Sequence, residues 1–305
     1  MASGTYPCTF DNSSQLYSNY NLILDGINVT IGPAPDAKGD VLIDIGEELG
    51  QFIYIPDYFE ITYSPPTRVI VNNLILANGF GSVLYSGSNN AIIVMNNVTV
   101  TNFTMNLISL FQVDDSIGRG LSSLVLNGCL ITNSTYSPQR ALPNIFGVLH
   151  SYAITETTIT SNTWTEWMFD QSGGVDATDQ LNVAFTNCSF SNNFYNNSFI
   201  LGTDNTNLTL TNVNFGDGGG PTSNSFIQCT DGDVTLDNVS GGGRFSLLDC
   251  AIHGNNYQVC KPSLSKGAII GIVVGSVTGA VAIIIIIVVV VKKVRSKNGS
   301  YQTIN

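Results

Sequence analysis

Between residues 69 and 243 the chain repeats a short phrase in which apolar and polar residues alternate. The copies read VIVNNLILAN from Val69, IIVMNNVTVTN from Ile92, LVLNGCLITN from Leu124, AITETTITSN from Ala153, VAFTNCSFSNN from Val183, LTLTNVNFGDG from Leu208 and a shortened VTLDNVSGGG from Val234. A period of two is typical of a β-strand with one buried face. Asn or Gly within each copy indicates a bend, because these residues tolerate a left-handed backbone. We therefore expect each copy to hold short strands joined by bends.

The copies recur at a nearly constant spacing. The marker positions before the second apolar group are Asn73, Asn97, Gly128, Thr158, Asn187, Asn212 and Asn238, which are 24, 31, 30, 29, 25 and 26 residues apart. A second apolar run follows each copy. Such a chain can wind into a coil whose turns stack about 4.8 Å apart and pair their backbones. We predict an all-β fold, a parallel β-helix over residues 21–257, capped by residues 1–20. A pair of antiparallel sandwiches is the alternative.

The segment AIIGIVVGSVTGAVAIIIIIVVVV, residues 268–291, carries no charge. As a helix it would rise about 36 Å, enough to cross a membrane core of about 30 Å. Four cations follow it at once: Lys292, Lys293, Arg295 and Lys297. Basic residues beside a span are retained in the cytoplasm. We predict a juxtamembrane linker at 258–267, a single transmembrane helix at 268–291 and a cytoplasmic tail at 292–305.

Charge divides at the predicted span. The residues before it hold 7 Lys and Arg against 22 Asp and Glu, a net charge of −15, whereas the tail carries +4. So acidic a domain does not suit a nucleic-acid partner. The start, MASGTYPCTF, lacks the pattern of a signal peptide. Either the natural N-terminus lies further upstream, or the helix is a tail anchor that leaves the domain in the cytosol. The composition favours the first.

Asparagine, serine and threonine are abundant and form acceptor sequons for N-glycans. We predict N-glycosylation at Asn12, Asn28, Asn97, Asn102, Asn133, Asn187, Asn196, Asn207 and Asn238. A lumenal or extracellular glycoprotein is the simplest interpretation, although asparagine-rich chains also produce sequons by chance.

Six cysteines suit an oxidising compartment without requiring one. Cys129 and Cys188 occupy the same place in phrases two turns apart, too distant for a disulfide, so we expect two buried thiols. Cys229 and Cys250 fall in nearly matching places of adjacent turns and form a possible disulfide. A bond between Cys250 and Cys260 is the rival.

The repeats resemble those of the right-handed parallel β-helix proteins, the pectin lyase-like superfamily, over approximately residues 21–250. That resemblance implies the fold and raises the possibility of polysaccharide cleavage by clustered carboxylates and a histidine. Candidates are Asp114 and Asp115, Asp204, and His253. Their order differs from that of the polygalacturonases, and no Arg-x-Lys follows His253. The sequence therefore favours a non-enzymatic protein, without metal or cofactor.

The sequence favours binding as the function, since a solenoid offers a long, regular face. Aromatic residues cluster in two successive turns, at Tyr152, Trp164 and Trp167 and then at Phe194 and Tyr195. If exposed they could stack on sugar rings, and if buried they belong to the core. Carbohydrate or another cell-surface protein is the expected partner.

Two further patterns concern the membrane segment and the tail. Gly267, Gly271, Gly275 and Gly279 recur every four residues, which predicts a helix-packing face and a possible homodimer. The ending GSYQTI resembles the tails of lysosome-associated membrane glycoproteins. That resemblance implies a sorting signal in which Tyr301 and Ile304 bind a clathrin adaptor.

These observations predict a single-pass type I membrane glycoprotein, located at the cell surface or in endosomes and lysosomes. Its solenoid would serve as a coat, adhesion or carbohydrate-binding domain. The alternative is a membrane-tethered polysaccharide lyase or glycoside hydrolase.

Overall fold

The structure is a computed structural model, and it describes residues 4–7, 20–24, 27–46, 51–55, 67–87, 90–105, 110–113, 122–136, 151–164, 181–195, 200–202, 206–216, 225–241 and 244–255. All of these belong to one compact unit, residues 1–260. The described residues are β-strands, bends and connecting segments, and every described strand pair is parallel. The prediction of an all-β parallel solenoid is confirmed, and the antiparallel sandwich is wrong for this part of the chain.

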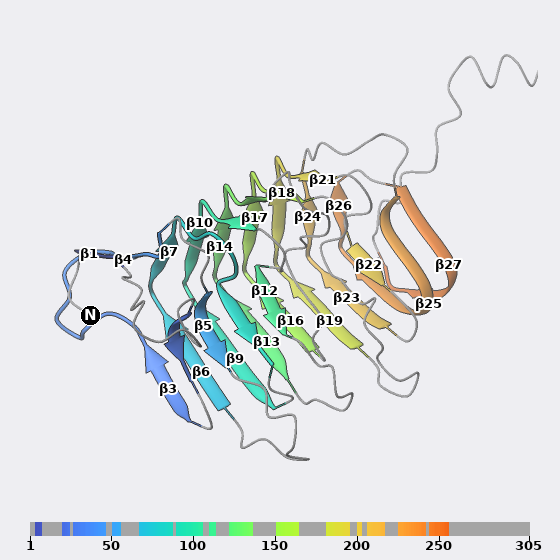
Figure 1. Cartoon of the computed structure of the whole chain (residues 1–305). Helices are drawn as coiled ribbons and strands as arrows, with labels where there is room; N and C mark the ends of the chain where they lie inside the picture. Colours follow the sequence, from blue (N-terminus) through green and yellow to red (C-terminus); the bar gives the residue numbers. More distant parts are fainter. Residues whose placement is uncertain are drawn as a thin grey trace, which may run out of the picture. The chain divides into compact units, whose positions relative to one another are not determined.

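The strands form three main sheets, which the chain visits in rotation up to β12 (Phe111–Val113); after that the described strands lie in sheets 1 and 2 and two short pairs (Figure 1). Sheet 1 contains β3 (Asn28–Ile31), β6 (Thr67–Asn72), β9 (Ala91–Asn96), β13 (Ser123–Asn127), β16 (Ser151–Thr155), β19 (Leu181–Thr186), β23 (Thr206–Thr211) and β25 (Ser225–Asp237), with β22 (Ile200–Gly202) and β27 (Arg244–His253) both paired to β25. Sheet 2 contains β1 (Gly4–Pro7), β4 (Val41–Asp44), β7 (Ile75–Ala77), β10 (Thr99–Thr101), β14 (Leu130–Thr132), β17 (Thr158–Thr160), β20 (Ser189–Ser191), β24 (Asn214–Phe215) and β26 (Ser240–Gly241).

Sheet 3 contains β2 (Tyr20–Ile23), β5 (Gln51–Ile55), β8 (Leu84–Ser86) and β12 (Phe111–Val113). Two smaller pairs follow sheet 2, β11 (Thr104–Met105) with β15 (Thr135–Tyr136) and β18 (Thr163–Trp164) with β21 (Phe194–Tyr195). β1 lies within the residues predicted as a cap and pairs with β4 at the edge of sheet 2.

The alternating pattern of each repeat determines which side chains enter the core. In sheet 1, for example, Val69 pairs with Ile93, which continues the column to Leu124. These residues are fully buried, and Tyr152 in the next turn is 2% exposed. Inward residues of successive turns thus stack into apolar columns, as the period of two predicts.

Two bends recur along the described solenoid, and residues with a left-handed backbone make the first in seven repeats and the second in five. The first bend joins sheet 1 to sheet 2 at Asn73, Asn97, Gly128, Glu156, Asn187, Asn212 and Asn238, with φ between 51° and 60°. The second bend follows sheet 2 at Asn78, Asn102, Asn133, Ser161 and Asn192, with φ between 53° and 58°. Asparagine is the residue other than glycine that most readily adopts this conformation, which explains its frequency here.

One repeat was aligned wrongly by the sequence. Thr158 pairs with Leu130, which places Glu156, rather than Thr158, at the first bend opposite Gly128. The error arises because TETT offers several similar polar positions, and neither threonine nor glutamate signals a left-handed backbone.

Asparagines of successive turns form amide ladders on the outside of both bends. At the first bend Asn97 Nδ2 donates to Asn73 Oδ1 at 3.2 Å. Further along, Asn212 Nδ2 donates to Asn187 Oδ1 at 3.0 Å, and Asn238 Nδ2 donates to Asn212 Oδ1 at 2.8 Å. At the second bend Asn102 donates to Asn78 at 2.6 Å, and Asn78 donates to Asp44 Oδ1 at 3.2 Å.

The predicted buried thiols are confirmed. Cys129 and Cys188 are free and buried, in the inward position that follows the first bend. Thr157 occupies that position between them, and its hydroxyl donates to the carbonyl of Thr155 at 2.9 Å. Burial raises the pKa of both cysteine thiols above the ordinary value of 9.0.

No helix among the described residues is long and apolar enough to span a membrane. The predicted linker, transmembrane helix and tail, residues 258–305, lie outside the described part of the chain.

Candidate binding groove

A groove of about 480 Å³ runs across the outer face of sheet 1, over β19, β23, β25 and β27. Its described lining residues are Asn182, Val183, Ala184, Asn207, Thr209, Asp233, Thr235 and His253. All of them except Val183, which points inward and is 3% exposed, are outward positions of successive turns, held in register by the parallel ladder. Asn182 pairs with the backbone of Asn207, which in turn pairs with Asp233.

The floor and the flank of the groove differ in chemistry. Ala184, Thr209, Thr235 and His253 form one column, in which three short side chains leave room above the sheet. Beside it runs the column of Asn182, Asn207 and Asp233, where Asn207 Nδ2 donates to Asn182 Oδ1 at 3.2 Å. Amides and hydroxyls offer both donors and acceptors, so this arrangement suits a neutral polar ligand.

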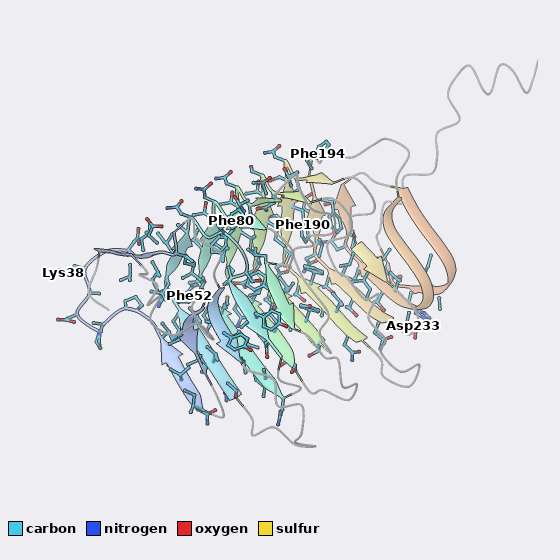
Figure 2. The ribbon with its side chains drawn as sticks, viewed as in Figure 1. Lys38, Phe52, Phe80, Phe190, Phe194 and Asp233 are labelled. Carbon is cyan, nitrogen blue, oxygen red and sulfur yellow. The ribbon has the colours of Figure 1, made fainter. Side chains whose placement is uncertain are left out.

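An imidazole and a carboxylate meet at the end of the groove. His253 Nε2 lies 3.4 Å from Asp233 Oδ1, and their side chains are 62% and 54% exposed. Figure 2 labels Asp233 at the strands of this end of sheet 1. So exposed a pair contributes little to stability. It can instead contact a ligand with both a donor and an acceptor, because His253 and Asp233 both remain accessible to solvent.

Only one of the four candidates weighed for catalysis, from which the sequence predicted no catalytic site, lies among the described residues. His253 lies in the groove, whereas Asp114, Asp115 and Asp204 lie outside the described residues. Asp233 is the only carboxylate among the described residues that line the groove. Acid and base catalysis on a glycosidic bond ordinarily uses two carboxyl groups. The described lining contains one carboxylate and one imidazole.

Seven of the nine sequon asparagines fall on described residues. Asn97, Asn187 and Asn238 lie at the first bend, and Asn102 and Asn133 at the second, all exposed. Asn28 is exposed on β3, whereas Asn207 is half-buried in the groove. Asn12 and Asn196 lie outside the described residues.

A second hollow, of about 670 Å³, lies beside Asn102. It is lined by Asp44, Gly46, Asn78, Gly79, Phe80, Asn102 and Thr104. Phe80 is partly exposed, and its backbone bridges to Thr104 in the next turn. The hollow thus combines one aromatic ring with the acidic end of the second-bend ladder.

The strand register does not place the proposed disulfide partners opposite one another. Cys229 pairs with Leu247, and Cys250 pairs with Gly232, so the two cysteines are three positions out of register. At about 3.3 Å per residue this offset is about 10 Å along the strands, beyond the usual reach of a disulfide. The backbone register therefore gives no support to a bond between Cys229 and Cys250. Cys260 lies outside the described residues, so the rival bond stays a prediction.

The aromatic residues divide between core and surface. Tyr152 is buried, whereas Phe194 is 50% exposed on β21 (Figure 2). Trp167, like the predicted Gly267, Gly271, Gly275 and Gly279 face and the Tyr301 and Ile304 signal, lies outside the described residues.

Comparison of the chain with known protein families, curated proteins and solved structures finds no match. The function must therefore be argued from the site itself.

The sequence did not indicate most of the groove. Asn182, Thr209 and Asp233 look like ordinary outward residues of alternating strands, and only their stacking produces a continuous surface. The signal that could have found them is the alignment of outward columns along the sheet. The column of Ala184 and Thr209 holds Val94 and Val125 in earlier turns and gains hydroxyls only in later ones. The column of Asn182 already holds Ser123 and Ser151.

Proposed function

We propose that this protein is a single-pass type I membrane glycoprotein whose solenoid binds ligands without catalysing a reaction. The observation that carries the proposal is the groove over β19 to β27, where stacked amide and hydroxyl side chains line a shallow surface. The proposed ligand is a neutral carbohydrate, whose hydroxyls alternate as donors and acceptors.

The geometry of the groove supports a repeating ligand. Equivalent side chains of successive turns lie about 4.8 Å apart, so a chain of sugars lying along the stack would meet similar groups at regular intervals. The net charge of −15 before the predicted span argues against an anionic polysaccharide, because like charges repel.

Membrane attachment rests on the sequence. The apolar segment at 268–291 and the four cations that follow support a span with a cytoplasmic tail. The tail ending in Tyr301 and Ile304 supports traffic between the cell surface and endosomes or lysosomes through a clathrin adaptor. The parallel crossovers support a right-handed coil of the pectin lyase-like type, since such connections are right-handed in nearly all proteins.

Asn207 links the groove to glycosylation. Among the described sequon asparagines it is the half-buried one, and its Nδ2 donates to Asn182 within the groove. A sugar on Asn207 would fill the space that we assign to the ligand. We therefore expect Asn207 to be unmodified in the binding-competent protein.

Binding to a panel of neutral oligosaccharides tests the proposal, with the purified full-length chain in detergent. Replacing Asn182 with Ala should weaken binding about tenfold, the equivalent of about 1.4 kcal/mol for a lost hydrogen-bonding group. Ser123→Ala is the matched control, because Ser123 is an outward residue of the same sheet outside the groove.

The competing enzyme hypothesis is tested on the same material. Incubation with uronic-acid polymers should leave their length unchanged. Cleavage that His253→Ala abolishes would contradict the non-catalytic proposal, and so would a panel in which Asn182→Ala binds every oligosaccharide as well as the natural chain does.

A further inference from the structure

The outer amide ladders run in one direction throughout the described solenoid. In every outer ladder bond Nδ2 donates to the preceding turn, from Asn78 to Asp44, Asn96 to Asn72, Asn97 to Asn73, Asn102 to Asn78, Asn127 to Asn96, Asn207 to Asn182, Asn212 to Asn187 and Asn238 to Asn212. Asn212 forms both a donor and an acceptor bond in the ladder. Its Nδ2 donates to Asn187 in the preceding turn, and its Oδ1 accepts from Asn238 in the following turn.

This direction determines which amide hydrogen the ladder uses. In Asn78 and Asn212 the C=O and N–H bonds of one amide point to opposite neighbours, so the hydrogen in the ladder is the one anti to the oxygen. Asn97, Asn102 and Asn238 donate to the preceding turn in the same columns, and we assign them the same hydrogen. The second hydrogen of Nδ2 points sideways, away from the stack. A sugar linked to Nδ2 creates a secondary amide, which keeps its remaining N–H anti to the oxygen by about 2.5 kcal/mol. An asparagine at a bend can therefore carry a glycan and keep its ladder bond.

The sequons at the bends also occupy the two borders of one sheet. Asn97, Asn187 and Asn238 lie where the chain enters sheet 2, and Asn102 and Asn133 lie where it leaves. The strand between the borders is only three residues long, as in β10. Glycans are bulky surface groups, so glycans on both borders would cover so narrow a face.

The hollow beside Asn102 offers space for the first sugar of such a glycan. Its wall includes the partly exposed ring of Phe80 and the side chain of Thr104, the sequon residue two positions after Asn102. An aromatic face can pack against the apolar side of a sugar ring.

We propose that N-glycans on Asn97, Asn102, Asn133, Asn187 and Asn238 form two rows that border sheet 2 and shield its outer face, which leaves sheet 1 as the accessible binding face. The outer hydroxyls of sheet 2 bond to one another instead, as between Thr158 and Ser189 at 3.1 Å and between Thr160 and Ser191 at 2.9 Å. This inference rests on the proposed function, because it needs the solenoid to pass through the secretory pathway.

Site occupancy gives the first test. The full-length chain is expressed from its own gene, and each glycosylated asparagine is identified by enzymatic release in ¹⁸O-water and mass spectrometry. We expect all five bend asparagines to be occupied, together with Asn28, which lies on β3 away from both borders. Thr104→Ala should remove the glycan at Asn102 without lowering the melting midpoint, whereas Asn102→Ala should remove both glycan and ladder bond and lower it.

Shielding gives the second test. Thr132→Cys places a thiol on the outer face of sheet 2, and Val125→Cys places one on the outer face of sheet 1 in the same turn. Their labelling by a bulky maleimide is compared before and after the glycans are trimmed to one sugar. We expect trimming to accelerate labelling several-fold at position 132 and to leave position 125 unchanged.

The outcomes separate the two proposals. If Asn28 is glycosylated but the bend asparagines are bare, or if trimming leaves the rate at position 132 unchanged, the shield is wrong and the membrane glycoprotein remains. If no asparagine is glycosylated, the solenoid does not enter the secretory pathway, and the proposed function is overturned with the shield.

Discussion

Asparagine stacks in two regions of this solenoid, one exposed and one buried. At the first bend the amides of Asn187, Asn212 and Asn238 bond to one another in contact with water. After the second bend, Asn162 and Asn193 lie inside the coil, with 0% and 2% exposure. The same residue type in the same kind of column therefore meets two different demands.

The side chains of Asn162 and Asn193 form hydrogen bonds with buried backbone groups as well as with each other. Asn162 Oδ1 accepts from Ser134 N at 2.9 Å, and its Nδ2 donates to the carbonyl of Ile131 at 2.9 Å. Asn193 Oδ1 accepts from Asn162 N at 3.0 Å, and Asn193 Nδ2 donates to the carbonyl of Ile159 at 2.8 Å. An unpaired buried polar group costs far more than an exposed hydrogen bond contributes. The buried asparagines therefore secure the fold, whereas the exposed ones mainly allow the bend.

The largest effect is expected from the buried pair. Asn162→Ala removes the partners of Ser134 N and the Ile131 carbonyl, and we expect it to lower the free energy of unfolding by about 3 to 5 kcal/mol. Urea denaturation measures this. A loss below about 1 kcal/mol would show that the two regions do not differ.

Substitutions in the exposed ladder should lower the free energy of unfolding by less. Two variants of Asn212 separate the contribution of the hydrogen bonds from that of the backbone conformation. Asn212→Ala loses two ladder bonds and places a Cβ without a favourable side chain at φ 52°, so we expect a loss of about 2 kcal/mol. Asn212→Gly loses the bonds but tolerates the backbone, and we expect about 1 kcal/mol. Equal losses in the two variants would mean that the backbone conformation contributes nothing.

The inward position after the first bend predicts a dependence on pH. Burial raises the pKa of Cys129 and Cys188, so the unfolded thiols lose their protons at a lower pH than the folded ones do. Stability from this source is present below the unfolded pKa of about 9 and falls as the pH rises toward the folded value. Denaturation between pH 7 and pH 10 should show the decline. The double variant Cys129→Val and Cys188→Val should reduce it, since Val98 and Val213 fill the equivalent places.

The smallest change in stability is expected from a variant that adds one asparagine to the exposed ladder. Glu156 interrupts the first-bend column with φ 51°, next to Asn187. Glu156→Asn should stabilise the protein by about 0.5 to 1 kcal/mol, because asparagine suits this backbone and can bond to its neighbour. Glu156→Ala is the control and should not stabilise. A gain in both variants would indicate relief of charge rather than a longer ladder.

The sequence predicted the architecture because the architecture is itself periodic. Alternation located the inward residues, and Asn or Gly located six of the seven first bends, from Asn73 to Asn238. The bend at Glu156 was not predicted, because a charged residue with a left-handed backbone has no local sequence signature. The burial of Asn162 and Asn193 was also not predicted. The equivalent positions in earlier turns hold Phe103 and Ser134, so the sequence shows no column of like residues there.

The groove was less accessible to sequence reasoning than the fold. The sequence identifies His253 as a candidate residue, but for catalysis together with Asp114 and Asp204. Its described partner is Asp233, twenty residues away along the chain and adjacent only through the pairing of β25 with β27. A surface made from one residue of each turn depends on register, and register was uncertain by two residues in the repeat of Glu156.

The most direct test of the central proposal is the topology of the full-length chain on intact cells. A tag within the solenoid is probed with antibody before and after permeabilisation, and the mass is measured with and without a glycan-removing enzyme. The proposal predicts antibody access to the solenoid at the surface of intact cells and a fall in mass on glycan removal. A tag that is reached only after permeabilisation, on a chain whose mass does not change, would contradict it.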